Sequence, residues 1–542
     1  MLSALAQALK SKPDMSAQDS QHYTRSLWRY NCLNLLLLVL LGAWLWQQNQ
    51  PLTLPEIKIP PAEKLQCVSY SPYYGKVQTP LVKDTRISTG QIDRDLALLS
   101  QHFQCVRIYS VSQGLDYVPE AASRLGLKVM LGAWIGWVKA DNDKELKLAT
   151  TLANRYPGTV TALIVGNEVL LRGEQTEAAM QDYLHTAKQA TKVPVTYADV
   201  WEFWLKHKSL EKSVDFVTVH VLPYWEDDPQ SIDHASQHTN AVMDELTASF
   251  SKPLFIGETG WPTQGRQRAG SVPSQLNQAR YLREFIQLAQ SKGWHYNLIE
   301  AIDQPWKRTL EGTVGGYWGL YSSDLKPKMQ FSGNQTERHD GWLPLCWALL
   351  GALVFGGAAR IQGERRSDAL LAISSLGALI AMVAPLQLGY LLAASRDATE
   401  MSALGALLLA GWLVLSSIML ALMQQTAARL AMLSTGLLLL LIGAAVAGWL
   451  QFSDGRYRDF PLALYALPAL QLSIGLWLAG IRIKASWRMA YVFGVIIATI
   501  AVITASVAVW REPGNLAAVL WLGVTLLFAT ACGVNAKLKE NH

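Results

Sequence analysis

The sequence predicts an α/β protein with a (β/α)8 TIM barrel, followed by an all-α polytopic transmembrane region. Two observations lead to this expectation. Between residues 64 and 335, short apolar or β-branched runs alternate with amphipathic stretches that carry charge throughout. Between residues 341 and 535, charged residues become rare and Leu, Ala and Gly dominate. At 542 residues the chain is also too long for one ordinary domain.

Eight candidate strands account for the barrel. They are expected at residues 66–71, 105–110, 128–134, 161–167, 193–198, 215–222, 253–258 and 296–302. Amphipathic helices are expected between them, for example at 91–102, 143–155, 177–190 and 275–291. A doubly wound open sheet is the alternative fold. If it bound a dinucleotide it would carry a Gly-rich turn after its first strand, where this chain has Ser-Pro-Tyr-Tyr at 71–74.

The N-terminal part is expected to hold a membrane anchor. We predict a cytoplasmic segment at 1–31, a transmembrane anchor at 32–47 and a Pro-rich linker at 48–63. A signal peptide is the alternative for the apolar run. Against a signal peptide, the polar segment before the apolar run is long, and no cleavage site of small residues follows the run.

Seven further apolar segments are long enough to span a bilayer. They lie at about 341–359, 369–394, 403–423, 430–451, 460–481, 489–510 and 515–534, before a tail at 536–542. The positive-inside rule predicts the orientation. The basic residues expected inside are Lys10, Lys12, Arg25, Arg29, Arg360, Arg365, Arg366, Arg429, Arg482, Lys484, Arg488, Lys537 and Lys539. Only Arg396, Arg456, Arg458 and Arg511 are expected outside. Both termini are therefore predicted to be cytoplasmic and the barrel extracytoplasmic.

Two glutamates mark the expected chemistry. The fourth candidate strand ends before Glu168, and the seventh ends in Glu258, which is followed at once by Thr-Gly-Trp-Pro. In a barrel the C-terminal ends of all strands face one opening, so these two residues can face each other across a cleft. Paired carboxylates about 5 Å apart suit retaining glycoside hydrolysis, in which one is protonated and the other ionised. Each glutamate alone could equally be an ion-paired surface residue.

These motifs resemble glycoside hydrolase family 17, the β-1,3-glucanases and glucan transglycosylases. The similarity rests on Asn167-Glu168 and on Glu258 with its Thr-Gly-Trp-Pro. It is supported by the stretches at 196–204, 220–225 and 300–307 and covers residues 64 to 330. It implies that Glu168 is the acid/base and Glu258 the nucleophile. Bacterial membrane-attached members are the nearest in pattern, which implies a multi-pass inner-membrane protein with a periplasmic barrel. The substrate implied is β-1,3-glucan, with hydrolysis, transfer or formation of β-1,6 linkages left open.

Other residues are expected around the glutamates, each with a structural alternative. Asn167 can bond the sugar 2-hydroxyl, or cap the next helix. Arg107 can keep Glu258 ionised, or form a structural ion pair. Tyr197 and His220 can orient the carboxylates, although His220 could equally be a core histidine.

Sugar-binding side chains are expected after several strands. Aromatic faces suit the apolar faces of pyranose rings, although any single one can be a core residue. Candidates are Trp134, Trp201, Trp204, Tyr224, Trp225, Trp261, Trp306 and Trp318, of which we single out Tyr224, Trp225, Trp261 and Trp306. Glu300, Asp303 and Lys307 after the eighth strand can bind hydroxyls or form an ion-paired loop.

The remaining expectations concern cofactors and partners. Two carboxylates suffice for this chemistry, so no metal or organic cofactor is implied. A net charge of +5 gives no reason to expect nucleic acid. The expected partners are a β-glucan, the lipid bilayer and a candidate glucan synthase. The rival function is a non-catalytic glucan-binding barrel that serves a membrane glucan synthase or export machinery. Whether Cys67 and Cys105 form a disulfide is left open.

Overall fold

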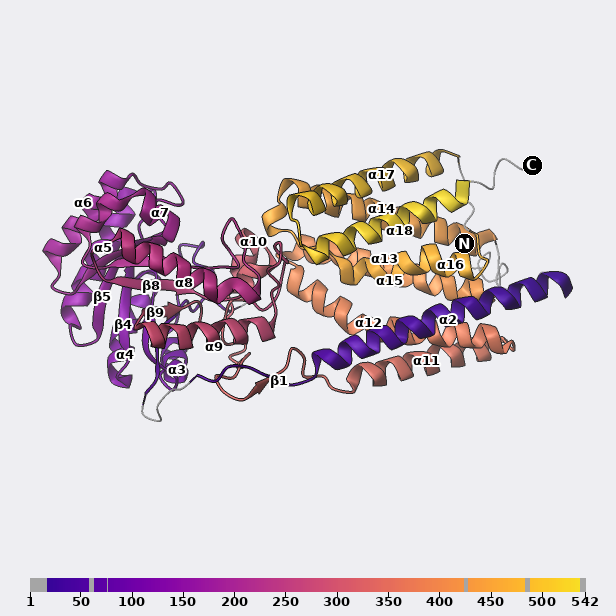
Figure 1. The fold of residues 1–542 in the computed structure, drawn as a ribbon, viewed down its shortest axis with the longest axis horizontal. Coiled ribbons are helices and arrows are strands. Elements are labelled where there is room, and N and C mark those ends of the chain that lie inside the picture. The colour runs from indigo at the N-terminus through magenta and orange to yellow at the C-terminus, as the bar shows by residue number, and fades with distance from the viewer. Residues whose placement is uncertain (1–16, 58–62, 76, 424–426, 483–487, 537–542) are drawn as a thin grey trace. The chain divides into compact units, whose positions relative to one another are not determined.

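The chain folds into two compact units (Figure 1). The computed structural model describes residues 17–57, 63–75, 77–423, 427–482 and 488–536. One unit comprises Leu52–Gln335, and the other comprises Met1–Pro51 together with Thr336–His542. Of the basic residues used to predict orientation, Lys10, Lys12, Lys484, Lys537 and Lys539 lie outside the described residues.

The first unit is a closed barrel of eight parallel strands, as predicted. The strands follow one another around the barrel in chain order, which excludes the open sheet. They are β2 (Leu65–Ser69), β3 (Phe103–Arg107), β4 (Lys128–Ala133), β5 (Val160–Asn167), β6 (Val195–Val200), β7 (Val217–His220), β8 (Leu254–Thr259) and β9 (His295–Leu298). Most are shorter than predicted, because the chain leaves the ladder to form the loops of the opening.

Helices connect these strands around the outside of the barrel. They are α3 (Thr89–Leu99), α4 (Val118–Leu125), α5 (Lys139–Arg155), α6 (Glu177–Ala190), α7 (Trp201–Lys206), α8 (Ile232–Ser249) and α9 (Gln275–Lys292), with the short α10 (Arg308–Glu311) after β9. Hydroxyl side chains start three of them: Ser88, Thr176 and Ser274 each accept a hydrogen bond from an amide of the first turn. A two-residue pair that the sequence did not predict, β1 (Leu52–Thr53) with β10 (Asn334–Gln335), joins the beginning and end of this unit.

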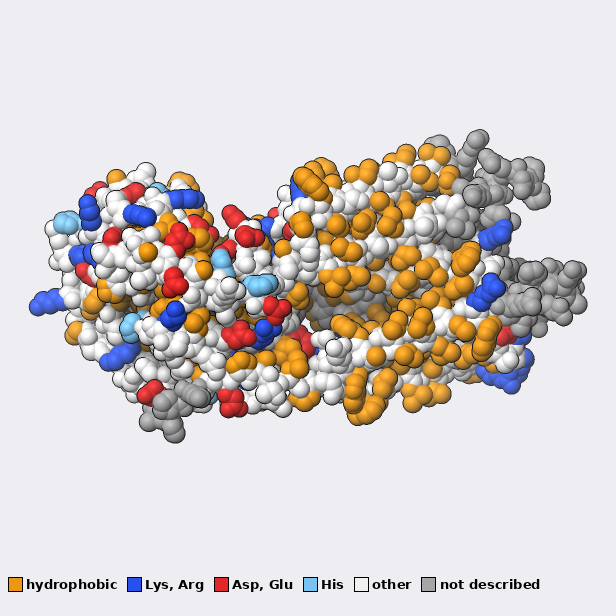
Figure 2. All heavy atoms as spheres, viewed as in Figure 1, with side chains coloured by type: hydrophobic (Ala, Val, Ile, Leu, Met, Phe, Trp, Pro, Cys, Tyr) orange, Lys and Arg blue, Asp and Glu red, His pale blue; other side chains and the backbone are white. Residues whose placement is uncertain are grey.

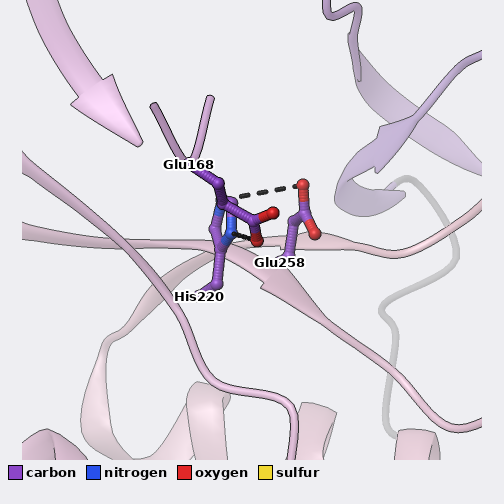
Figure 3. A group of neighbouring side chains, drawn as sticks. All are labelled: Glu168, His220 and Glu258. Atoms are coloured by element: carbon purple, nitrogen blue, oxygen red, sulfur yellow. Dashed lines mark hydrogen bonds and ion pairs between the residues drawn. The ribbon is translucent and has the colours of Figure 1, made fainter. Parts of the chain in front are cut away.

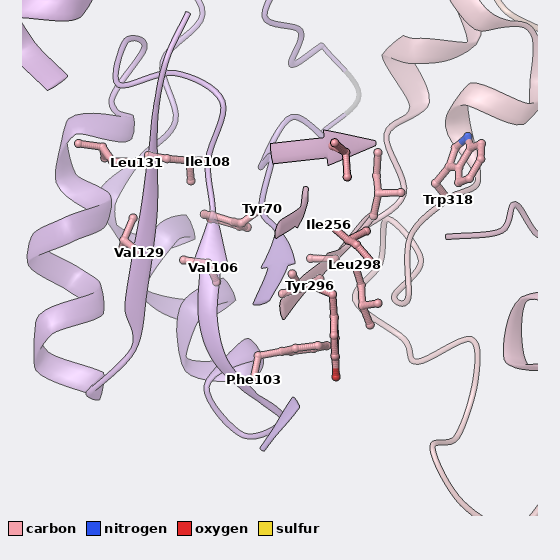
Figure 4. Packing of buried hydrophobic residues seen from close by; sticks show 14 of the residues in the cluster. Tyr70, Phe103, Val106, Ile108, Val129, Leu131, Ile256, Tyr296, Leu298 and Trp318 are labelled. Carbon is pink, nitrogen blue, oxygen red and sulfur yellow. The ribbon is translucent and has the colours of Figure 1, made fainter. Parts of the chain in front are cut away.

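Side-chain alternation along the strands divides the barrel core into two parts. Residues such as Val106, Val129 and Leu131 point outward and pack beneath the helices (Figure 4). The inward-pointing set at the floor is small and apolar: Cys67, Cys105, Met130, Ala162, Ile164 and Ala198. Cys67 and Cys105 face each other in register on neighbouring strands and form a disulfide.

The second unit is all-α and strongly apolar, and Figure 2 shows hydrophobic side chains over its helices. It contains α2 (Ala17–Gln48), α11 (Leu343–Ile361), α12 (Ser367–Ala394), α13 (Ala398–Met423), α14 (Ala427–Ser453), α15 (Leu462–Leu470), α16 (Leu476–Leu478), α17 (Arg488–Arg511) and α18 (Leu516–Ala536). Seven helices of the described chain are long and apolar enough to cross a membrane.

Two of the expected spans differ in detail. The anchor expected at 32–47 is part of the much longer α2. The span expected at 460–481 is divided by a π-helical turn, Gln471–Gly475, between α15 and α16. In this turn the side chain of Gln471 makes hydrogen bonds to Tyr30 and Asn34 of α2, and π-turns often occur at functional positions.

Candidate active site

Both predicted catalytic glutamates lie at irregularities of their strands. The β5–β6 register shifts between Ile164 and Asn167, immediately before Glu168. The β8–β9 register shifts between Ile256 and Thr259, on either side of Glu258. Gly166 has φ +83°, and a Cβ there would lie 2.7 Å from the side chain of Val169. These bulges re-aim the two carboxylates toward the opening of the barrel.

His220, at the end of β7, lies beside both carboxylates (Figure 3). Its Nδ1 is 2.8 Å from Oε1 of Glu168, and its Nε2 is 3.6 Å from Oε1 of Glu258. One carboxylate oxygen of each glutamate and one ring nitrogen of His220 lie within 4.8 Å of one another. The imidazole is fully enclosed, whereas the Glu168 side chain is 23% exposed. A solute can therefore reach Glu168 from the opening.

Arg107, at the end of β3, makes hydrogen bonds to residues of both β5 and β8. Its Nη1 donates to Glu258 at 3.1 Å and to the carbonyl of Gly257 at 2.6 Å, and its Nη2 donates to the side-chain oxygen of Asn167. A Cβ at Gly257 would lie 2.5 Å from Thr218 Cγ2 and 3.2 Å from His220 Cδ2, so glycine allows β7 to pack closely against β8 beside the guanidinium. The buried charge of Arg107 thus has a carboxylate and two oxygen acceptors as partners.

Tyr109 is a site residue that the sequence analysis missed. Its hydroxyl donates to Oε1 of Glu258 at 2.8 Å. Burial and the negative charge of Glu258 raise the pKa of this phenol well above its usual value, so it remains a hydrogen-bond donor. The signal was present in the sequence, because Tyr109 follows Arg107 by two positions, and such residues share one side of an extended chain.

The pKa of Glu168 departs from the expectation for a proton donor. Burial raises it, but the hydrogen bond and charge of His220, together with Arg172 and Arg107, outweigh burial and lower it below its usual value. A carboxylic acid catalyst would be expected to have a raised pKa. The site therefore holds Glu168 mainly as a carboxylate that is hydrogen-bonded to His220.

Glu168, His220 and Glu258 also form a donor set that could hold a metal ion. The guanidinium of Arg107 lies 3.1 Å from Glu258 Oε1 and 3.4 Å from His220 Nε2. At these distances the positive charge of Arg107 already balances part of the negative charge of the three residues. It would also repel a metal cation bound by them.

The hydrogen bonds of Tyr197 go to neighbours of Glu168 in the fold and not to either carboxylate. Its hydroxyl donates to Asp199 and accepts from the amide of Leu170 at 2.9 Å. Ala198 points into the barrel, so its neighbour Tyr197 points outward. Tyr197 instead holds the turn that follows Glu168.

The three charged residues after β9 form ion pairs, which was the alternative left open. Lys307 Nζ lies 2.9 Å from the buried Glu300, and Lys328 Nζ lies 2.6 Å from Asp303. Burial raises the pKa of Glu300 to about 7, against the lowering effect of Lys307. Lys307 also interacts electrostatically with Glu258, and Glu311 with both catalytic candidates, so this loop faces the site. Glu311 was not predicted.

The singled-out aromatic residues divide into two groups. Trp261 and Tyr224 are fully buried, with Trp261 Nε1 donating to the Val272 carbonyl and the Tyr224 hydroxyl to that of Arg266. Their rings pack on each other with centroids 5.8 Å apart, so they support the loops and offer no face to a ligand. Trp225 and Trp306 are half-buried and keep accessible surface.

Comparisons with known proteins concern the barrel. The model of the BtgE/BtgC glycoside hydrolase domain matches residues 67–319. "Probable beta-glucosidase btgE" of Aspergillus flavus is 28% identical over 240 residues, which are 43% of this chain and 39% of that protein. "Glucan 1,3-beta-glucosidase" of Saccharomyces cerevisiae is 26% identical over 263 residues, or 44% of this chain and 83% of that protein. The crystal structure of a glycoside hydrolase family 17 beta-1,3-glucanosyltransferase from Rhizomucor miehei covers 50% of this chain and 98% of its own, with 26% identity and a TM-score of 0.44.

The family match and the site geometry concern the same part of the chain. Glu168, His220 and Glu258 all lie within the matched residues, and the apolar helices α11 to α18 lie beyond them. The resemblance inferred from the sequence motifs is confirmed at the level of the domain. Residues 67–319 of this chain are thus similar to the BtgE/BtgC glycoside hydrolase domain, by model match and by motif.

Proposed function

We propose that the barrel is a retaining glycoside hydrolase or transglycosylase that acts on β-1,3-glucan. The observation that carries this proposal is the pair of carboxylates, Glu168 and Glu258, which each place an oxygen within 4.8 Å of the other. Retaining enzymes hold their carboxyl groups about 5–5.5 Å apart, whereas inverting enzymes leave about 6.5–9.5 Å for a water molecule. The names of the relatives support β-1,3-glucan as the substrate.

In the first step, Glu258 attacks the anomeric carbon of the sugar and forms a glycosyl ester. Glu168 gives a proton to the glycosidic oxygen, which leaves with the departing sugar. In the second step, Glu168 takes a proton from water or from a sugar hydroxyl. The resulting oxygen nucleophile displaces Glu258, which returns to its carboxylate form. Arg107 and Tyr109 both donate hydrogen bonds to Oε1 of Glu258 and so orient the carboxylate for attack.

The proton for the first step is held by Glu168 and His220 together. Nδ1 of His220 lies 2.8 Å from Oε1 of Glu168, so the proton lies in a hydrogen bond between the carboxyl group and the imidazole. The hydrogen bond and charge of His220 lower the pKa of Glu168, against the effect of burial.

We further propose that the protein is anchored in a membrane with the barrel outside the cytoplasm. The apolar helices and the charge bias of their loops support anchoring and orientation. A disulfide in the barrel suits an oxidising compartment. A bacterial inner membrane and cytoplasmic termini remain predictions. Reporters fused after Lys328 test the topology, and activity of a cytoplasm-specific reporter alone would reject it.

Product analysis tests the proposed activity. The full-length chain in detergent is incubated with β-1,3-linked and β-1,6-linked oligosaccharides. Shorter products indicate hydrolysis and longer ones transfer, and either outcome supports the proposal. Binding without any product indicates the alternative, a glucan-binding barrel that serves a membrane glucan synthase or export machinery.

A further inference from the structure

Two tryptophans of the barrel are unusually exposed. Within the described part of Leu52–Gln335, Trp134 and Trp137 are the only exposed tryptophans, at 41% and 70%, and the others are half-buried or buried. Both lie in the loop between β4 and α5 (Figure 1), beside the exposed Val138. A cluster of large exposed apolar side chains on a soluble domain commonly marks a binding surface.

The loop that carries them is fixed in place. Asn142 bonds Gly136 twice at 2.8 Å, once to its amide and once to its carbonyl. Gln175 donates to the same carbonyl at 2.6 Å. The two indoles are therefore held on a rigid backbone, which reduces the entropy lost when a ligand binds.

Arg172 links this surface to Glu168. Its guanidinium lies 4.5 Å from the ring centroid of Trp134 and donates to the carbonyl of Asn167, the residue before Glu168. Its amide donates to the carbonyl of Glu168 at 2.9 Å. Glu258 stands on β8, whereas β4 and β5 are hydrogen-bonded neighbours. The exposed indoles thus belong to the Glu168 side of the opening.

We propose that Trp134 and Trp137 form a platform for the acceptor sugar of a transfer reaction, a pyranose of a second β-glucan chain. This inference rests on the proposed function. Glu168 must take a proton from the attacking hydroxyl, so the acceptor has to bind on the Glu168 side. The apolar face of its ring stacks on an indole, and Arg172, Glu174 and Gln175 offer polar partners at the edge.

The transfer step balances without another reactant. The acceptor oxygen forms a bond to the anomeric carbon while the ester bond to Glu258 breaks. The hydroxyl proton goes to Glu168, and Glu258 leaves as a carboxylate. Water follows the same route in hydrolysis but gains nothing from the platform. The platform therefore raises the fraction of intermediates that end in transfer.

The proposed platform is tested by measuring how the glycosyl-enzyme intermediate divides between transfer and hydrolysis. The full-length enzyme in detergent is given an aryl β-laminaribioside as donor and laminaritriose as acceptor. Aryl release reports formation of the intermediate, and product lengths report its fate. We expect Trp137→Ala to lower the ratio of transfer to hydrolysis roughly tenfold, about the effect of losing one stacking contact. Trp137→Phe should lower it less. The control Leu125→Ala removes an exposed apolar side chain at the end of α4 and should leave the ratio unchanged.

A second measurement does not depend on a variant at the platform. Oxidation of tryptophans by N-bromosuccinimide is mapped by mass spectrometry in the Glu258→Gln enzyme, with and without laminarioligosaccharide. We expect protection of Trp134 and Trp137. An unchanged ratio in Trp137→Ala, or oxidation unaffected by saturating sugar, overturns the platform. Absence of aryl release from the wild type rejects the proposed hydrolase instead.

Discussion

Nδ1 of His220 lies 2.8 Å from Oε1 of Glu168, and Nε2 of the same ring lies 3.6 Å from Oε1 of Glu258. The proposed acid/base therefore does not stand alone in an apolar pocket. It shares a hydrogen bond with a group that can itself hold a proton. His220 and Glu258 are also register partners on β7 and β8, so one imidazole is fixed relative to both carboxylates.

Replacing His220 by Asn should raise the pKa of Glu168. The hydrogen bond and charge of the imidazole lower that pKa in the wild type, while burial raises it. In the wild type, the lowered pKa of Glu168 stabilises the folded state at pH values above the pKa of this group in the unfolded chain. This stabilisation is lost as the pH falls through its pKa in the folded state. Infrared difference spectra should therefore show Glu168 taking up its proton at higher pH in the variant. The Glu168→Gln/His220→Asn enzyme identifies the band, and an unchanged titration would contradict the shared-proton model.

The two glutamates should differ in their dependence on the leaving group. Glu168→Gln should slow cleavage of a glucan by about 10²–10⁴-fold, because the sugar oxygen leaves unprotonated. It should slow formation of the intermediate from a nitrophenyl glycoside much less, because nitrophenolate needs no proton. Glu258→Gln should prevent formation of the glycosyl-enzyme from either substrate. Stopped-flow release and mass spectrometry measure both steps, and equal losses in the two variants would refute the assigned roles.

Arg107→Met should destabilise the barrel because it leaves Glu258 buried without its charge partner. Breaking a buried pair in this way typically lowers the free energy of unfolding by about 3–5 kcal/mol. Adding Glu258→Gln should recover part of that loss. The exposed Arg124 pairs with Asp93 and Glu120, and its replacement by Met provides a control that should change stability little. Tryptophan fluorescence during denaturant unfolding compares these three variants with the wild type.

The barrel could be predicted because its strands and helices leave separate periodic signals in the sequence. The position of the glutamates followed from the rule that strand ends converge at one opening. The direct partners of Tyr197 could not be predicted, because a range of apolar residues does not reveal which residues face inward. The inward set, which includes Ala198, becomes known only when the register around the closed barrel is known.

Contacts between loops that are distant along the chain could not be predicted from the sequence. Trp261 follows a catalytic motif directly, yet it turns into the core against Tyr281 on α9. The lowered pKa of Glu168 depends on Arg107, Arg172 and His220, which come from three different elements. Patterns along the chain locate each strand end, but they do not specify which side chains meet above the barrel.

Reduction of the Cys67–Cys105 bond should lower the stability of the barrel without moving the catalytic groups. The bond lies among the floor residues and closes a chain separation of 38 residues. The chain-entropy model assigns about 4 kcal/mol to a loop of this length. The Cys67→Ser/Cys105→Ser variant should melt at lower temperature in calorimetry, with the same KM. A shift on non-reducing gels checks that the bond forms in the native membrane.

Cutting the chain after α2 should not release this helix from the other apolar helices. Tyr30 donates to Gln471 at 2.7 Å, and Gln471 donates to Asn34 at 2.9 Å, which in turn donates to Ser375 at 3.2 Å. All four side chains are buried, so α2 is a bundle member joined to α12 and to the π-turn.

A protease site inserted after Pro51 separates the fragments for this test. Replacing Gln471 by Leu should weaken retention of α2 in mild detergent roughly tenfold, since it removes two interhelical hydrogen bonds of about 0.6–2 kcal/mol each. Gln387→Leu is the matched control, because Gln387 accepts from Trp412 and links α12 to α13 alone. Co-purification of the cleaved fragments measures retention. If Gln387→Leu released α2 as readily as Gln471→Leu, retention would reflect general helix packing, and the polar network would have no specific part in it.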